Sequence, residues 1–167
     1  PSMADAVADL GLGWTTSPLQ VMAAAPIDVD PPAGVSLRLI EPDEAAVVAA
    51  ARVVSEAFGS PHVEEHEHIR RRLRLGLNVT VVAEVAGAVV GVTTLQPIGD
   101  VGELVGAATL VPYRRRGIGD AMIRHLVRHA HGLGVELLLL SASEDGVGVY
   151  ERIGFRTVAT LAEAPPD

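Results

Sequence analysis

The fold of this chain is decided by the stretch RRRGIGD at residues 114–120, which joins an apolar segment to an amphipathic one. The segment Val101–Val111 has the apolar and small residues of a strand, and Gly117–His131 has the spacing of an amphipathic helix. Glycines at a strand-to-helix turn let backbone N–H groups face outward, where the first helical turn and its dipole favour an anion such as a pyrophosphate. The same glycines also meet the steric needs of any tight turn, so the local pattern leaves both interpretations open.

Strand and helix signals continue on both sides of this turn. Before it we expect a strand at Val35–Ile40, helices from Pro42 to Phe58 and from His62 to Leu75, and hairpin strands at Asn78–Val85 and Ala88–Leu95. After it we expect a strand at Val135–Leu140, a short helix ending at Arg152 and a strand at Phe155–Leu161. Because Val135–Leu140 is almost entirely apolar, it predicts a strand covered on both faces. The alternation of strands and helices indicates the α/β class.

Composition excludes several kinds of chemistry. The chain has 167 residues, which is about one domain, and no cysteine, so disulfides, thiolate zinc sites and a cysteine nucleophile are excluded. All its basic residues other than histidine are arginines, which excludes a Schiff-base lysine. A net charge of −8 argues against nucleic acid as a partner and favours cationic ones. We see no membrane-spanning stretch and no signal peptide, and therefore expect a cytoplasmic protein.

Two motifs, Arg114-x-x-Gly117-x-Gly119 and VYERIGF at 149–155, resemble the signatures of the GNAT superfamily of acetyl-CoA-dependent N-acetyltransferases. The run Arg114-x-x-Gly117-x-Gly119 is similar to that superfamily's pyrophosphate motif, and VYERIGF at 149–155 is similar to its (L/V)YxxxGF run. The resemblance covers roughly residues 35–161 and implies an α/β, GNAT-like fold with a mixed central sheet flanked by helices. The chain departs from the pattern at Val111, where many members have proline.

The resemblance implies that acetyl-CoA is the co-substrate and which residues bind it. The backbone at Ala107, Ala108 and Thr109 would pair with the pantetheine arm, and Ser143 stands where many members have an asparagine that contacts CoA. The residues whose backbone amides would wrap the pyrophosphate are Arg115, Arg116, Gly117, Ile118, Gly119 and Asp120.

Two further residues are implied to be catalytic. Tyr150 stands where the superfamily has its usual general acid, and a phenol can hand a proton to a departing thiolate. Glu103 resembles the strand glutamate that serves some members as general base, removing a proton from the protonated amine acceptor. A solvent-facing structural glutamate is the other interpretation of Glu103, and a water chain is the other route for the proton.

Histidines crowd the segment His62–His68, together with Glu64, Glu65 and Glu67. Such a cluster can bind zinc or nickel, but acids followed by arginines are also the normal charge order of a helix, and we expect no metal. The acids would instead guide a cationic amine. His125 and His129 are one helical turn apart and are expected to be packing residues rather than metal ligands.

The first 34 residues differ from the rest, because they contain aspartates and no basic residue. We expect an N-terminal extension at 1–34 and a GNAT-like domain at 35–167. A bare sheet edge would remain after 155–161, and the strand-like run LQVMA at 19–23 is the unassigned segment that could cover it. We therefore expect residues about 19–24 to pair beside 155–161, in the same chain or in a homodimer. The alternative is a disordered acidic leader.

These observations predict an N-acetyltransferase that moves an acetyl group from acetyl-CoA to a primary amine of a small molecule or peptide. Without cysteine to hold the acyl group, attack would be direct, in a ternary complex. One alternative is a non-catalytic acyl-CoA-binding module, and another is an interaction domain with no ligand.

Overall fold

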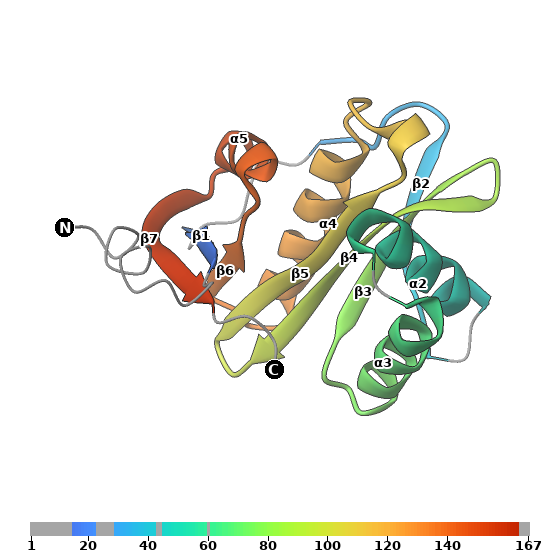
Figure 1. Ribbon diagram of the computed structural model, residues 1–167, viewed down its shortest axis with the longest axis horizontal. Helices are drawn as coiled ribbons and strands as arrows, with labels where there is room; N and C mark the ends of the chain where they lie inside the picture. The colour runs from blue at the N-terminus through green and yellow to red at the C-terminus, as the bar shows by residue number, and fades with distance from the viewer. Residues whose placement is uncertain (1–14, 23–28, 43–44, 60, 164–167) are drawn as a thin grey trace.

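The computed structural model of the chain describes residues 15–22, 29–42, 45–59 and 61–163 (Figure 1). The strands are β1 (Thr15–Met22), β2 (Val35–Leu39), β3 (Val79–Val85), β4 (Ala88–Ile98), β5 (Val101–Thr109), β6 (Leu137–Ser141) and β7 (Arg156–Glu163). The helices are α2 (Ala45–Phe58), α3 (His62–Arg74), α4 (Ile118–Gly132) and α5 (Glu144–Ile153), with a short 3₁₀ helix, η1, at Val111–Tyr113.

The described strands form one mixed sheet in the order β2-β3-β4-β5-β6-β1-β7. β5 and β6 are parallel, and the other neighbours are antiparallel. This arrangement confirms the α/β class and the mixed central sheet flanked by helices. Among the described helices, none is long and apolar enough to cross a membrane.

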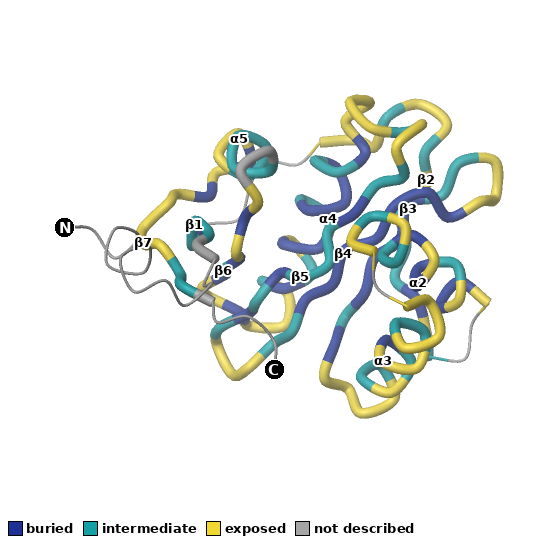
Figure 2. The backbone as a smooth tube through the Cα atoms, in the orientation of Figure 1, coloured by how far each residue is buried: buried dark blue, intermediate teal, exposed yellow. Residues whose placement is uncertain are grey.

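Helices cover both faces of the sheet, with α2 and α3 on one side and α4 on the other (Figure 1). On the side of α4, which we call the α4 face, Leu104 and Leu138 pack with Met122 and Leu126 of the helix. On the opposite α2 face, Val92 and the helix residue Val53 lie in a second core. The buried residues therefore run along the central strands and the inner sides of these helices (Figure 2).

The strand that leads into the turn ends earlier than predicted. β5 stops at Thr109, and Pro112 lies in the 3₁₀ helix that follows. Proline cannot donate to a strand ladder and is favoured in the first turn of a helix, which accounts for the shorter strand.

The prediction that Val135–Leu140 is covered on both faces is wrong. Leu138 and Leu140 are buried on the α4 face, but Leu137 is 36% exposed and Leu139 is only partly buried. The reason is that α2 packs over β4 and β5, so the α2 face of β6 lies outside its cover. The run of leucines could not reveal this, because the reach of a distant helix is not encoded locally.

β1 lies between β6 and β7 and is antiparallel to both. It is longer at its start than the predicted run, and Leu19 and Val21 pair with Ala159 and Arg156 of β7. Gln20 and Met22 are buried, with Met22 in the core of the α4 face. Residues 23 and 24 of the expected strand lie outside the described residues. The domain boundary at residue 34 and a homodimer stay predictions.

Truncation of Met22 tests whether β1 is part of the folded core. Met22→Ala is expected to lower the free energy of unfolding by about 2–5 kcal/mol, because it leaves a cavity beside Gly154 and the buried core. Val158→Ala on exposed β7 is the control and should change it by less than about 0.5 kcal/mol. Chemical denaturation measures both. Fast amide exchange at Gln20 and Val21, together with an unchanged free energy of unfolding in Met22→Ala, would mean that the segment is only a tail.

Candidate active site

β5 and β6 separate partway along their length. Their parallel pairing joins Val101–Glu103 to Leu137–Leu139, and past that point no described strand pairs with the inner edge of either. β5 continues to Thr109 beside β4, while β6 continues beside β1. The result is a V-shaped opening edged by backbone N–H and C=O groups that no described strand uses.

The inner edge of β5 contains the strand residues that were singled out from the sequence. Leu110 N donates to Val90 O on β4 at 2.9 Å, so by alternation Thr109 presents its own backbone groups to the opening. Ala107 shares that edge by the same alternation, and Ala108 turns its backbone toward its β4 partner, Val92.

A bulge shapes β5 at the same place. The ladder with β4 shifts register between Val92 and Thr94, and Gly106 of β5 has φ +61. A glycine in the left-handed region is typical of a bulge that adds one residue to a strand. Leu104 consequently packs on the α4 face and Ala108 on the α2 face, although both positions are even.

The turn after β5 presents unpaired amides at the start of α4. Arg115 and Gly117 have φ +57 and +77, and Gly117 begins the helix without a side-chain capping bond. The first helical bond runs from Ala121 N to Gly117 O at 3.0 Å. The N–H groups of residues 118–120 therefore have no partner within the helix, and left-handed residues among them form a concavity suited to an anion.

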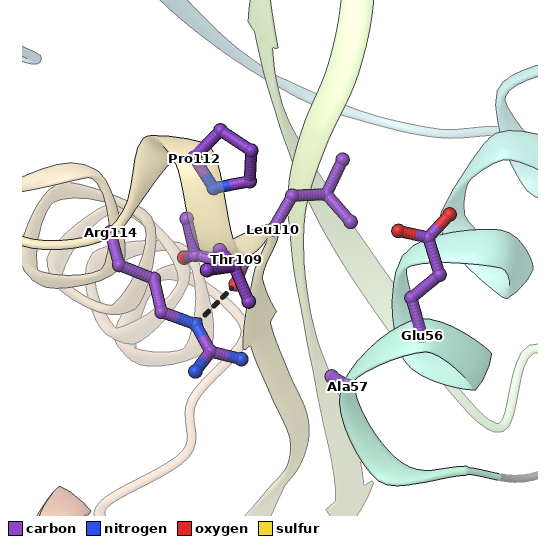
Figure 3. Close-up of a pocket in the computed structure, with 7 residues that line it drawn as sticks. Glu56, Ala57, Thr109, Leu110, Pro112 and Arg114 are labelled. Carbon is purple, nitrogen blue, oxygen red and sulfur yellow. Dashed lines mark hydrogen bonds between the residues drawn. The ribbon is translucent and has the colours of Figure 1, made fainter.

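The side chains of the turn keep this concavity open. Arg114 Nε donates to Thr109 O at 2.9 Å and folds back along β5 (Figure 3). The Arg116 guanidinium lies over the Tyr113 ring at 5.4 Å from its centre. Asp120 Oδ2 is 2.8 Å from Arg124 Nε, so its negative charge is compensated beside the amides. A Cβ on Gly119 would have Thr109 Oγ1 as its nearest neighbour, at 3.8 Å. The turn thus fits a pyrophosphate.

A small cavity of about 80 Å³ adjoins this turn where α2 ends (Figure 3). It is bounded by Glu56 and Ala57 of α2 on one side and by residues of the β5–α4 connection on the other. These α2 residues were not predictable from the sequence, because nothing local in α2 indicates which strand end it will approach. The cavity holds only a few waters' volume, so it is a recess of the opening rather than the whole site.

Tyr150 lies on α5 and packs against the core of the α4 face. Its ring meets that of Phe155 edge to face, with centroids 5.9 Å apart. Burial raises the pKa of the phenol above its ordinary value near 10, because the phenolate would lose its hydration. No hydrogen bond joins the Tyr150 hydroxyl to any residue that the structure describes. The hydroxyl is therefore protonated at neutral pH and able to donate.

Ser143 precedes α5 as its N-cap residue, just beyond the end of β6. Its side chain makes no capping bond, and its carbonyl accepts from Gly146 N at 2.8 Å. A Cβ on Gly146 would come within 3.2 Å of the Tyr150 ring and 3.1 Å of Ser143 Oγ. Gly146 thus lets the serine and the tyrosine share one side of α5.

Glu103 is the last residue of β5 that pairs with β6. Its neighbours Gly102 and Leu104 face α4, so alternation directs the Glu103 side chain to the α2 face. Tyr150 approaches from the α4 face. The structure therefore does not bring the two predicted catalytic residues into contact, but places them on opposite sides of the V-shaped opening.

The histidine-rich start of α3 lies on the surface. His62 Nε2 is 3.2 Å from Val48 O, and His66 Nδ1 is 3.5 Å from Glu67 Oε1. Glu64 is exposed and Glu65 is partly so. Within the described residues, no group of three or more His, Asp or Glu side chains is arranged to hold a metal ion.

The sequence places the chain in a known family. The acetyltransferase (GNAT) family matches residues 43–155, and the chain belongs to that family. The resemblance drawn from the two motifs is thereby confirmed. No curated protein matches the chain.

Solved structures share the fold. The chain is similar to a GCN5-related N-acetyltransferase from Kribbella flavida (21% identity, TM-score 0.73, 100% of this chain and 65% of that one). It is also similar to a GCN5-related N-acetyltransferase from Sphaerobacter thermophilus (21%, 0.77, 99% and 58%). A predicted acetyltransferase from Clostridium acetobutylicum, solved with acetyl-CoA, matches at 20% identity and TM-score 0.60, over 74% of this chain and 91% of that one. This chain spans less than two thirds of the first two proteins.

Proposed function

We propose that this protein is an N-acetyltransferase that uses acetyl-CoA as co-substrate and a primary amine as acceptor. The observation that carries the proposal is the continuous path from the V-shaped opening between β5 and β6 to the uncapped amides at the start of α4. An extended thiol arm that ends in a pyrophosphate matches that path, because a strand edge and a helix start bind those two parts.

Different residues would hold different parts of acetyl-CoA. The inner edge of β5 at Ala107 and Thr109 would pair with the pantetheine amides, and residues 115–120 would bind the pyrophosphate through backbone N–H groups. Ser143 lies at the far side of the opening and offers one hydroxyl. When bound, acetyl-CoA supplies the acetyl group as a thioester.

Two residues of the chain, one on each face of the sheet, would then accept and donate the protons of the reaction. Glu103 on the α2 face would accept the proton that the ammonium group of the acceptor must lose before it attacks. Tyr150 on the α4 face would donate a proton toward the leaving sulfur. Because the chain has no cysteine, transfer would be direct, in a ternary complex.

Thiol release tests the proposal. The protein would be incubated with acetyl-CoA and a panel of small amines and peptides, and free CoA measured against a reaction without acceptor. Acceptor-dependent CoA release is expected. Acetyl-CoA binding without release for any amine would favour a non-catalytic binding module, and no thermal shift with acetyl-CoA would contradict both.

Replacement of Glu103 is expected to change the pH dependence of the reaction. Glu103→Gln cannot accept the proton of the acceptor, so kcat/KM should fall most at low pH, where the amine is protonated. The loss should shrink as pH rises and free amine becomes abundant. Rate profiles of both proteins under conditions where chemistry limits the rate measure this effect. An unaltered profile would make Glu103 a structural residue.

A further inference from the structure

Arg72 is held in place on α3 by two neutral side chains. Its Nε donates to Asn78 Oδ1 at 2.8 Å, and its Nη2 donates to Gln96 Oε1 at 3.1 Å. Asn78 is buried just before β3, and Gln96 lies on β4. A guanidinium has more N–H donors than these two bonds use, so Arg72 retains donors for a further acceptor.

The position of Gln96 brings Arg72 close to the candidate base. Gln96 of β4 is the register partner of Glu103 of β5. Directly opposed residues of an antiparallel pair project to the same face with Cβ atoms about 4.5–5.5 Å apart. Arg72 therefore lies on the α2 face, one side chain away from Glu103, near the point where β5 and β6 separate.

Neither charge has an ionic partner in the part of the chain that the structure describes. Among the described residues, no carboxylate lies within ion-pair distance of Arg72 and no cation within that distance of Glu103. By contrast, Arg38 pairs with Glu84 at 3.1 Å, and Arg70 with Glu67 at 3.6 Å. A fixed cation and a carboxylate, near each other but not paired, complement a ligand that has both charges in the opposite order.

Beyond Glu103, toward β6, the α2 face is only partly covered. Leu139 of β6, the register partner of Glu103, is only partly buried, and Leu137 beside it is 36% exposed. Of the described helices, α2 packs over β4 and β5, so the α2 face of β6 beside Glu103 lies outside its cover. An acceptor would reach Glu103 from this face of the sheet.

We propose that the acceptor is a free amino acid, whose carboxylate binds Arg72 while its amine lies at Glu103. The inference rests on the proposed acetyl transfer and names its substrate class. The amine and carboxylate of an amino acid are separated by only a few bonds, which suits two charged groups on neighbouring positions of one sheet face. The terminal amine and terminal carboxylate of an extended peptide are too far apart to bind both.

The transfer remains balanced with this acceptor. The amine nitrogen forms a bond to the acetyl carbon, and the carbon–sulfur bond breaks with its electron pair on sulfur. The ammonium group loses one proton to Glu103 before attack, and the nitrogen loses a second to solvent as the carbon–sulfur bond breaks. The sulfur takes a proton from Tyr150, whose phenolate regains one from solvent, so one proton is released overall. The products are an N-acetyl amino acid and CoA, and the acceptor's carboxylate is unchanged throughout.

The test compares the common L-amino acids, each beside its own C-terminal amide, in the thiol-release assay. An amide keeps the amine and side chain but lacks the negative charge, so the wild type should prefer the acid by about tenfold or more in kcat/KM. Arg72→Ala should remove this preference by lowering kcat/KM for the acid while leaving that for the amide nearly unchanged. Arg71→Ala, on the same helix and exposed, should keep the preference.

Three results would overturn the inference. The wild type could use acids and amides equally well, or could acetylate other amines of the panel and no amino acid. Arg72→Ala could also lower both rates to the same extent, which would mean that Arg72 only ties α3 to the sheet. Failure of every amine in the panel to support CoA release is a different outcome, because it would contradict the proposed acetyl transfer itself.

Discussion

Tyr150→Phe is expected to lower kcat by about 10²–10⁴-fold while leaving the Kd for acetyl-CoA close to that of the wild type. The substitution removes one oxygen and keeps the ring that packs edge to face on Phe155. Binding and folding should therefore survive, and only the proton donor is lost. The Tyr150 hydroxyl bonds no described residue, so its removal leaves no protein partner unsatisfied.

Tyr113→Phe is the matched control for this change. Tyr113 is the other tyrosine of the chain, and its ring supports the Arg116 guanidinium without using its hydroxyl. Its kcat should stay within about twofold of the wild type, since no proton transfer depends on it. Steady-state rates and calorimetric Kd values measure both variants. A Tyr150→Phe protein with near-normal kcat would mean that another acid or water protonates the sulfur.

The pH dependence of kcat gives a second readout for Tyr150. Burial raises the pKa of its phenol, so the group stays protonated as pH rises to and beyond its ordinary value near 10. The acid should therefore not be lost in the neutral or mildly alkaline range, and any loss due to the phenol should appear only above pH 10. That alkaline loss should be absent in Tyr150→Phe.

Gly119→Val is expected to weaken acetyl-CoA binding by about tenfold or more, because its branched side chain covers the amides that face the pyrophosphate. The fold should tolerate it, since Gly119 does not have a positive φ and the nearest atom to a new Cβ is 3.8 Å away. Gly117 is a poorer choice. Its φ of +77 makes any side chain strained there, so lost binding could reflect a distorted turn.

Gly132→Val at the other end of α4 serves as the control. Gly132 also lacks a positive φ, and a Cβ there would meet nothing within 4 Å. The chemical change is the same and also falls within α4, but Gly132 lies far along the helix from the turn, so acetyl-CoA affinity should be unaltered. Titration calorimetry on both folded variants decides the matter. Unchanged affinity in Gly119→Val would rule out binding by this turn.

The sequence could predict the features that depend on neighbouring residues. The left-handed geometry at Gly117 follows from a glycine between a strand and a helix, and the family motif around Tyr150 is likewise local. The exposed face of β6 was not predictable, because it depends on where α2 ends over the sheet. The sequence also did not single out Arg72, to which we assign a role in acceptor binding. Among the four arginines at 70, 71, 72 and 74 nothing local distinguishes it, and its contact with Gln96 exists only in the folded chain.

Chemical-shift mapping of backbone amides during titration with acetyl-CoA locates the co-substrate site without relying on turnover. We expect the largest saturable shifts on residues 115–120 and on the inner edge of β5 at Ala107 and Thr109. Amides at the far end of α4, near Gly132, should stay in place. Saturable binding that leaves residues 115–120 unperturbed, or no binding by the folded protein, would contradict the account.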